Sequence, residues 1–229
     1  MYNDYRRVNL SPYRGKLKAT CSAGGFFTQE TLSGINLTQE DFSNRCLIGS
    51  AVQTSALRDG CCRYLRAQGT RFQDFSIDHV LCDYGHYQDC SWTGFEVRNS
   101  FLTGSHFSGC TFEAIKGELS SFGLSVFSGC KLRGSRLNEV SFSGAWWHNC
   151  RFEQEDYSFV RFPSAVFIET TFVGCRLQKA IFRAATFIRC TFEKCTLNES
   201  VFHKARLIDT KWIDTDIHQA ANLERVRYD

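Results

Sequence analysis

Large apolar residues recur at every fifth position of this chain, at the residue numbers that end in 2 or 7. From Leu32 to Ile217 all but four of these central positions hold Leu, Ile, Val, Phe, Tyr or Trp. The exceptions are Cys62, Ala67, Cys82 and Gly117. A period of five matches neither the period of an α-helix, about 3.6 residues, nor the two-residue alternation of a strand. It predicts a stack of short repeats in which each repeat buries its apolar residue against its neighbours.

A second constrained position lies two residues before each central one, where Ser, Ala, Thr and Cys dominate and seven of the twelve cysteines fall. The pattern is plain in Cys110-Thr111-Phe112 and Cys130-Lys131-Leu132. It resembles the pentapeptide repeat family, and the resemblance runs from about residue 27 to residue 228. It implies an all-β fold, a right-handed, four-sided parallel β-helix in which the central and small residues point inward. Four repeats would make one coil, so residues twenty apart would stack.

The twenty-residue columns support four distinct sides, since one column of central residues is aliphatic and the other three are rich in Phe. With strands about 4.8 Å apart, nine to ten coils predict a rod roughly 45 Å long. We divide the chain into an N-terminal cap (1–26), the β-helix (27–217) and a C-terminal cap (218–229). One extra residue between Ile217 and Leu223 predicts a distorted last coil. Predicted core residues include Phe112, Leu132, Phe142, Phe152, Phe172, Phe192, Cys90, Cys110, Cys130 and Cys150.

The formal net charge of +3 comes from the N-terminal segment, because residues 32–217 hold equal numbers of basic and acidic side chains. We expect residues 1–26 to fold over the first coil. No apolar run is long enough to span a membrane and no secretory signal is evident, so we expect a cytoplasmic protein. Most cysteines occupy a position where Ser and Ala also serve, so we expect reduced thiols.

Two groups of side chains raise the question of metal binding. Cys90, Cys110, Cys130 and Cys150 would stack as an inward ladder that could hold a soft metal or form disulfides. We interpret them instead as small apolar fillers. His86 and His106 stack on an outward position, away from those thiols, so no metal or cofactor site is predicted. Gly117, in place of a bulky central residue, predicts a dent or bend in the rod.

Function is expected on the outward positions, because the inward ones are committed to the core. Isoleucines twenty apart in one outward column and β-branched residues on the adjoining side form apolar ladders that favour a binding surface, although β-propensity alone also favours them. The candidate interaction residues are Ile168, Ile188, Ile208, Ile181, Val201 and Trp146. A basic outward column is more typical of a solvated face, so direct nucleic-acid binding is not predicted. That column holds Arg71, Lys131, Arg151 and Lys211.

The function that these features favour is a non-enzymatic, rigid scaffold that binds a protein partner or a second copy of itself. No catalytic motif occurs, and an interior filled with Phe should leave no cavity for a substrate. The pentapeptide repeat family also includes DNA mimics that protect bacterial gyrase or topoisomerase IV from quinolones or toxins, and proteins linked to secretion or acting as effectors. Both remain alternatives. DNA mimicry calls for an acidic rod, whereas this rod is balanced, so no site is transferred from that group.

Overall fold

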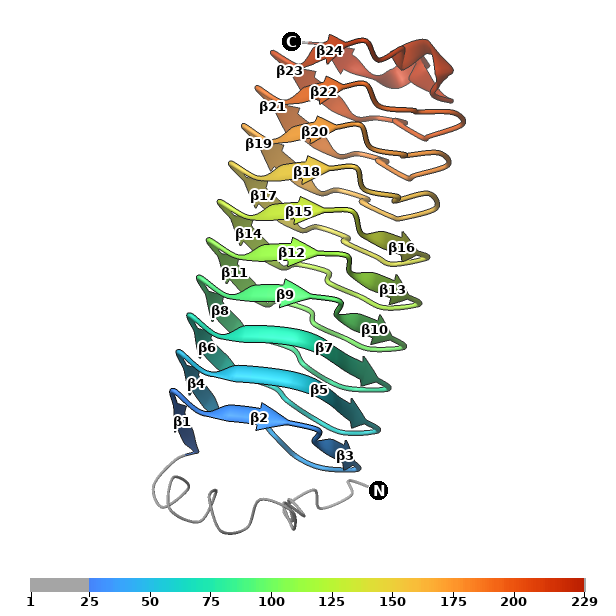
Figure 1. The fold of residues 1–229 in the computed structure, drawn as a ribbon. Coiled ribbons are helices and arrows are strands. Elements are labelled where there is room, and N and C mark those ends of the chain that lie inside the picture. The colour runs from blue at the N-terminus through green and yellow to red at the C-terminus, as the bar shows by residue number, and fades with distance from the viewer. Residues whose placement is uncertain (1–24, 229) are drawn as a thin grey trace.

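Nearly every strand of this chain pairs in parallel with strands that lie twenty residues before and after it. Phe167, for example, is in register with Trp147 on one side and with Phe187 on the other. The computed structural model describes residues 25–228, which wind into a parallel β-solenoid of about ten coils (Figure 1). The prediction of an all-β solenoid built from five-residue repeats is therefore confirmed.

One side of the rod is an 11-stranded sheet with one strand from each coil, which we call the β1 side. In each three-residue strand the middle residue points inward and its two neighbours point outward. The strands are β1 (Phe26–Thr28), β4 (Cys46–Ile48), β6 (Arg66–Gln68), β8 (His86–Gln88), β11 (His106–Ser108), β14 (Val126–Ser128), β17 (Trp146–His148), β19 (Val166–Ile168), β21 (Thr186–Ile188), β23 (Arg206–Ile208) and β25 (Arg227–Tyr228).

The next two sides share a 14-stranded sheet, because β5 and β7 run round the corner between them. The β2 side contains β2 (Thr31–Ser33), β5 (Ala51–Arg58), β7 (Arg71–Asp78), β9 (Ser91–Thr93), β12 (Thr111–Glu113), β15 (Lys131–Arg133), β18 (Arg151–Glu153), β20 (Thr171–Val173), β22 (Thr191–Glu193) and β24 (Lys211–Ile213). The β3 side adds β3 (Asn36–Thr38), β10 (Glu96–Arg98), β13 (Lys116–Glu118) and β16 (Arg136–Asn138).

The fourth side is held by isolated parallel bridges instead of strands, and we call it the bridge side. These bridges also join residues twenty apart, from Asp41 with Cys61 up to Val201 with Ala221. All four sides therefore share one register, as the stacking of the predicted columns requires.

The chain turns its corners through residues with positive φ, two positions after the inward central residue. Gly174 (φ 61°) and Asn149 (φ 51°) suit this left-handed region, which costs glycine nothing and asparagine little. Leu119, Leu124 and Phe159 adopt it as well. Such bulky residues persist there only because the coils above and below determine the backbone.

Aromatic rings stack along the rod inside the C-terminal half. Phe167 lies 4.7 Å from Phe187 between ring centroids, and Phe172 lies 4.5 Å from Phe192. Rings on neighbouring sides meet edge to face, as Phe167 and Phe172 do at 62°. Both arrangements are those that aromatic quadrupoles favour. The structure buries the ten residues that the sequence assigns to the core: Phe112, Leu132, Phe142, Phe152, Phe172, Phe192, Cys90, Cys110, Cys130 and Cys150.

The expected dent at Gly117 is absent from this part of the rod. A Cβ atom added to Gly117 would lie 2.6 Å from Leu137 Cδ2 and 3.2 Å from Val97 Cγ1, so neighbouring side chains already occupy the space. Ile115, at the usually small position of the same repeat, is buried. Ile115 thus adds apolar volume in the repeat where Gly117 lacks a side chain, although a small apolar cavity of about 30 Å³ remains beside Ile115 and Leu137.

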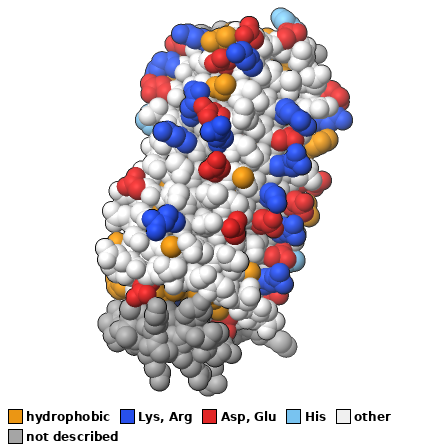
Figure 2. All heavy atoms as spheres, viewed as in Figure 1, with side chains coloured by type: hydrophobic (Ala, Val, Ile, Leu, Met, Phe, Trp, Pro, Cys, Tyr) orange, Lys and Arg blue, Asp and Glu red, His pale blue; other side chains and the backbone are white. Residues whose placement is uncertain are grey.

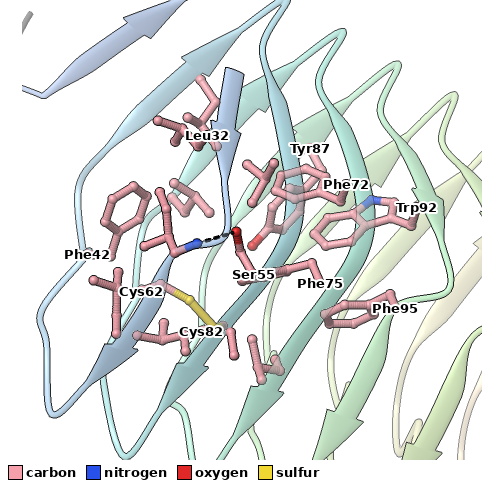
Figure 3. A pocket seen from close by; sticks show the side chains of 18 of the residues that line it. Leu32, Phe42, Ser55, Cys62, Phe72, Phe75, Cys82, Tyr87, Trp92 and Phe95 are labelled. Carbon is pink, nitrogen blue, oxygen red and sulfur yellow. Dashed lines mark hydrogen bonds between the residues drawn. A yellow bond between two sulfur atoms is a disulfide. The ribbon is translucent and has the colours of Figure 1, made fainter. Parts of the chain in front are cut away.

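The expectation of a completely filled interior is wrong near the N-terminal end. There, an apolar cavity of about 60 Å³ lies among coils that carry the small central residues Cys62 and Cys82 (Figure 3). The Ser55 hydroxyl in its wall donates to the carbonyl of Gln53 and accepts from the N–H of Ile35, at 2.7 and 3.1 Å. The Ser55 hydroxyl is therefore already hydrogen-bonded within the chain, and the rest of the cavity wall is almost entirely apolar.

The last coil departs from the twenty-residue register, as the extra residue after Ile217 predicts. Two short 3-10 helices, η2 (Ile217–Gln219) and η3 (Leu223–Arg225), precede β25. Leu207 of β23 then pairs with Tyr228, an offset of 21 residues. The predicted N-terminal cap lies almost wholly outside the described residues. Within residues 25–228, no helix combines the length and hydropathy needed to cross a bilayer.

A disulfide joins Cys62 to Cys82 on the bridge side, with 4.6 Å between their Cα atoms (Figure 3). The expectation of reduced thiols throughout is therefore wrong for this pair. The other nine described cysteines are free. Stacking brings the two residues together, because they occupy the same central position in consecutive coils.

Breaking this disulfide should destabilise the N-terminal half of the rod. The bond closes a loop with a sequence separation of 20, so Cys62→Ala should lower the free energy of unfolding by about 3 kcal/mol. Urea unfolding followed by circular dichroism, with and without a reductant, measures the change. Cys61→Ala is the matched control, because Cys61 is adjacent and free. Equal midpoints with and without reductant for the unaltered chain would contradict the disulfide.

Candidate interaction face

A band of apolar side chains lies on the outer surface of the β1 side, in its C-terminal half. Strand pairing puts its members in two parallel outward columns that flank the inward residues of β14, β17, β19, β21 and β23. One column holds Val126, Trp146 and Val166, and the other holds Ile168, Ile188 and Ile208. We call these six residues the apolar band.

Members of the apolar band differ in exposure. Trp146 is 53% exposed and Val126 is 39% exposed, whereas Val166 and the three isoleucines are half-buried. Neighbours in one column are only about 4.8 Å apart, so each β-branched side chain covers part of the next. The outcome is a ridge of aliphatic surface that contains one indole, that of Trp146, between Val126 and Val166.

Charged side chains beside the apolar band pair with one another. Glu169, at the corner after Ile168, accepts hydrogen bonds from Arg189 at 2.8 and 3.1 Å and lies 3.8 Å from His148 Nε2. Across the outward positions of β14, β17, β19, β21 and β23, Arg206 of β23 is the one Lys, Arg, Asp or Glu. A partner that covers the apolar band would therefore need to desolvate few charges.

The structure separates the predicted interaction residues into two groups. Trp146 lies on the same side as Ile168, Ile188 and Ile208, so these four can form one surface. Ile181 and Val201 bridge to each other on the bridge side, around the corner from β21 and β23, and both are half-buried. Sequence reasoning did not single out Val126 and Val166, which flank Trp146 in register.

Other exposed apolar residues were also not singled out, and three of them stand at corners. Leu124 is 69% exposed, Leu119 is 59% exposed and Phe159 is 48% exposed. Each occupies the positive-φ position, where Gly or Asn has the smallest conformational strain. A bulky residue two positions after a central one is the sequence signal that would have found them.

The predicted basic column lies on the β2 side, where it does not form a patch of one sign. Figure 2 shows basic and acidic side chains interspersed over the face that includes this side. Arg151 of the column pairs with Glu153, and on the β3 side Asp156 pairs with Arg176 at 3.3 Å. The mixture of signs fits the expectation of a solvated surface.

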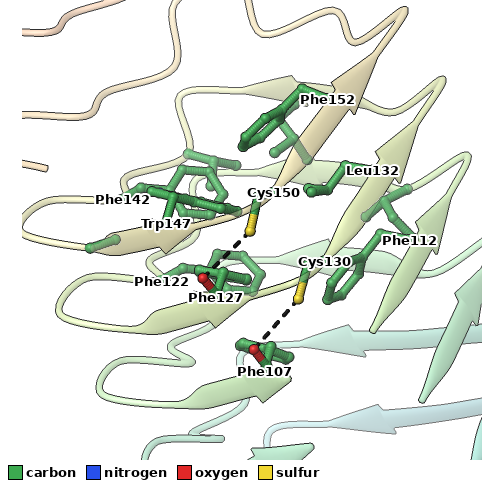
Figure 4. Close-up of a cluster of buried hydrophobic side chains, with 14 of the residues drawn as sticks. Phe107, Phe112, Phe122, Phe127, Cys130, Leu132, Phe142, Trp147, Cys150 and Phe152 are labelled. Atoms are coloured by element: carbon green, nitrogen blue, oxygen red, sulfur yellow. Dashed lines mark hydrogen bonds between the residues drawn. The ribbon is translucent and has the colours of Figure 1, made fainter. Parts of the chain in front are cut away.

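The inward thiols are hydrogen-bonded to the backbone. Cys130 Sγ donates to the carbonyl of Phe107 and Cys150 Sγ to that of Phe127, at 3.5 and 3.4 Å (Figure 4). Burial raises the pKa of the Cys190 thiol to about 11, so this thiol is protonated near neutral pH. A protonated, buried thiol is neither a nucleophile nor a metal ligand. Over residues 25–228, no three His, Cys, Asp or Glu side chains come together as a metal-binding group.

The sequence reasoning did not identify the buried carboxyl groups, of which Glu155 is the more deeply buried. Glu155 occupies the usually small inward position and is 1% exposed, and its Oε2 accepts a hydrogen bond from the Ser135 N–H at 3.2 Å. Burial raises the pKa of Glu155 to about 8, and hydrogen bonds with Tyr157 and Ser135 lower it by less. Glu155 is therefore largely neutral at pH 7.

Comparison with known proteins finds similar folds at low identity. A family model described as the SV2A/B/C luminal domain matches residues 160–226. No curated protein matches this chain. Full-length QnrB1, a plasmid-mediated fluoroquinolone resistance protein, is 14% identical with a TM-score of 0.47, over 90% of this chain and 94% of that one.

Two cyanobacterial pentapeptide repeat proteins are also similar to this chain. HetL from Nostoc sp. strain PCC 7120, involved in heterocyst differentiation regulation, is 14% identical with a TM-score of 0.34, over 92% of this chain and 94% of that one. Rfr23 from Cyanothece 51142 is 12% identical with a TM-score of 0.20, over 69% and 95% of the two chains. We transfer no residue or function from these proteins.

Proposed function

We propose that this protein is a rigid, non-catalytic scaffold that binds a protein partner through the apolar band of its β1 side. The observation that supports this most directly is the register of Trp146, Val166, Ile168, Ile188 and Ile208 on one outer face. Stacked aromatic rings fill the interior behind that face, so the surface is held rigid before a partner arrives.

A single charge in the apolar band tests the proposal. Ile188→Asp puts a carboxylate at the centre of the buried contact and should weaken association by about tenfold or more. The control is Val173→Asp, since Val173 is a half-buried, β-branched, outward residue on the β2 side. Light scattering across a concentration series measures binding to a second copy, and co-purification from the native host compares the two variants for other partners. Equal binding by the two variants in both assays would refute the apolar band as the docking face.

The alternative of gyrase or topoisomerase IV protection makes a different prediction. A supercoiling assay with gyrase and ciprofloxacin distinguishes the two functions. Protection at near-stoichiometric protein, unaffected by Ile188→Asp, would replace the scaffold proposal with the protective one.

A further inference from the structure

A hollow of about 540 Å³, lined by both polar and apolar residues, lies on the outer surface of the β1 side, N-terminal to the apolar band. Its lining residues come from β4, β6, β8 and β11, which are the strands along the left edge of the rod in Figure 1. This volume is in the range of small-molecule sites. Its polar lining residues are Arg66, His86 and His106 in one column and Gln68, Gln88 and Ser108 in the other.

The first column is a row of hydrogen-bond donors that strand pairing holds at a fixed spacing. Arg66 is in register with His86, and His86 with His106, whose ring centroid lies 6.0 Å away. All three side chains are exposed. A guanidinium offers a planar fork of N–H donors, and an imidazole offers at least one.

Within residues 25–228, these three donors have no carboxylate partner. Two other histidines of the chain do lie beside carboxylates: His79 is 2.9 Å from Asp78, and His148 is 3.8 Å from Glu169. No Asp or Glu lines the hollow. The nearest in sequence, Asp89, accepts from Gln88 Nε2 at 3.3 Å, and its Oδ1 lies against Gly109 at the corner. The hollow therefore presents positive charge and donors that nothing in the described chain neutralises.

We propose that this hollow binds a linear oligophosphate, either free or as the phosphate chain of a larger molecule. Three donors at the strand spacing span about 10 Å along the rod, which one phosphate cannot contact at both ends but two or three linked phosphoryl groups can. Arg66 would bind phosphoryl oxygens through two N–H groups, with the imidazoles of His86 and His106 next along the chain. The amides of Gln68 and Gln88 would contact the remainder of the ligand. This site is separate from the apolar band.

Calorimetric titration of the full chain at constant ionic strength tests the proposal. Tripolyphosphate should bind about tenfold or more tightly than orthophosphate, because only the longer anion reaches all three donors. Arg66→Ala should weaken tripolyphosphate binding by about tenfold, and His106→Gln should weaken it by less. Adding a nucleoside triphosphate distinguishes a free oligophosphate from a phosphate chain on a larger molecule, since only the latter gains affinity from contacts to Gln68 and Gln88.

Arg133→Ala is the matched control, because it removes the same charge from an exposed position on the β2 side. Circular dichroism checks that each variant keeps its fold. Equal loss of affinity in Arg66→Ala and Arg133→Ala would show that net charge alone attracts the anion, and would overturn the site. Orthophosphate binding as tightly as tripolyphosphate, no binding of either, or binding only of a phosphodiester oligonucleotide would also overturn it. Ile188→Asp should leave tripolyphosphate binding unchanged, so the two proposals can fail independently.

Discussion

Phe142→Asp should unfold the rod. The Phe142 ring is 3% exposed and its centroid lies 5.1 Å from Phe122, 5.2 Å from Phe162 and 5.3 Å from Trp147. Removing a buried Phe costs about 3–5 kcal/mol, and placing an unpaired carboxylate in that space costs several kcal/mol more. Together these exceed or approach the whole free energy of unfolding of a typical domain, roughly 5–15 kcal/mol.

The five-residue frame supplies the control for this experiment. Ser143 is the next residue and points outward into solvent, so Ser143→Asp should change the melting temperature by only a few degrees. Far-ultraviolet circular dichroism and thermal melting measure both variants. A folded Phe142→Asp variant with the melting temperature of Ser143→Asp would contradict the inward assignment of the central position.

Glu155→Gln should stabilise the protein at pH 8 and have little effect at pH 4. The pKa of Glu155 is raised from 4.5 to about 8 by burial, so the unfolded chain releases this proton at a lower pH than the folded chain does. The unaltered protein therefore keeps its full stability from this group below pH 4.5 and loses it as the pH rises toward 8. The loss is about 1.4 kcal/mol for each pH unit within that window. The amide that Glu155→Gln introduces does not titrate, so the variant does not lose this stability as the pH rises.

Urea unfolding of both proteins at several pH values between 4 and 9 measures this effect. Glu153→Gln is the control, because Glu153 is two residues away but points outward and pairs with Arg151. The difference in unfolding free energy between Glu155→Gln and the unaltered chain should grow with pH, whereas the control should show no such trend. A pH-independent difference for Glu155→Gln would show that the carboxyl group is not held neutral in the folded state.

Most of the fold could be predicted from the sequence, because every coil repeats the same five-residue pattern of small and large inward residues. The central residues at fixed spacing determine which side chains point inward, and the twenty-residue columns determine the stacking. The cavity and the disulfide could not be predicted, because they depend on how the side chains of neighbouring coils together fill the core. Cys62 and Cys82 are small where large residues are the rule, which allows both a cavity and a disulfide. Gly117 is small as well, yet Leu137 occupies its space.

The candidate surfaces could be predicted only in part. Position in the repeat shows that Ile168, Ile188 and Ile208 point outward, and the structure places Trp146 beside them on the same side. Repeat position also places Ile181 and Val201 on the adjoining side, where they bridge to each other, but it did not single out Val126 and Val166 beside Trp146. It also could not show that outward side chains of β6 and β8 surround a hollow, because concavity depends on how neighbouring side chains lean.

The 21-residue offset of β25 has a consequence for growth of the rod. A solenoid end presents unpaired N–H and C=O groups, and a second molecule that stacked there in register would begin a fibre. Leu207 pairs with Tyr228 where a regular coil would supply residue 227, so this end is one residue out of step with the other sides. An incoming coil with twenty residues per turn cannot match all four sides at once. We expect this mismatch to disfavour in-register stacking of another coil on β25.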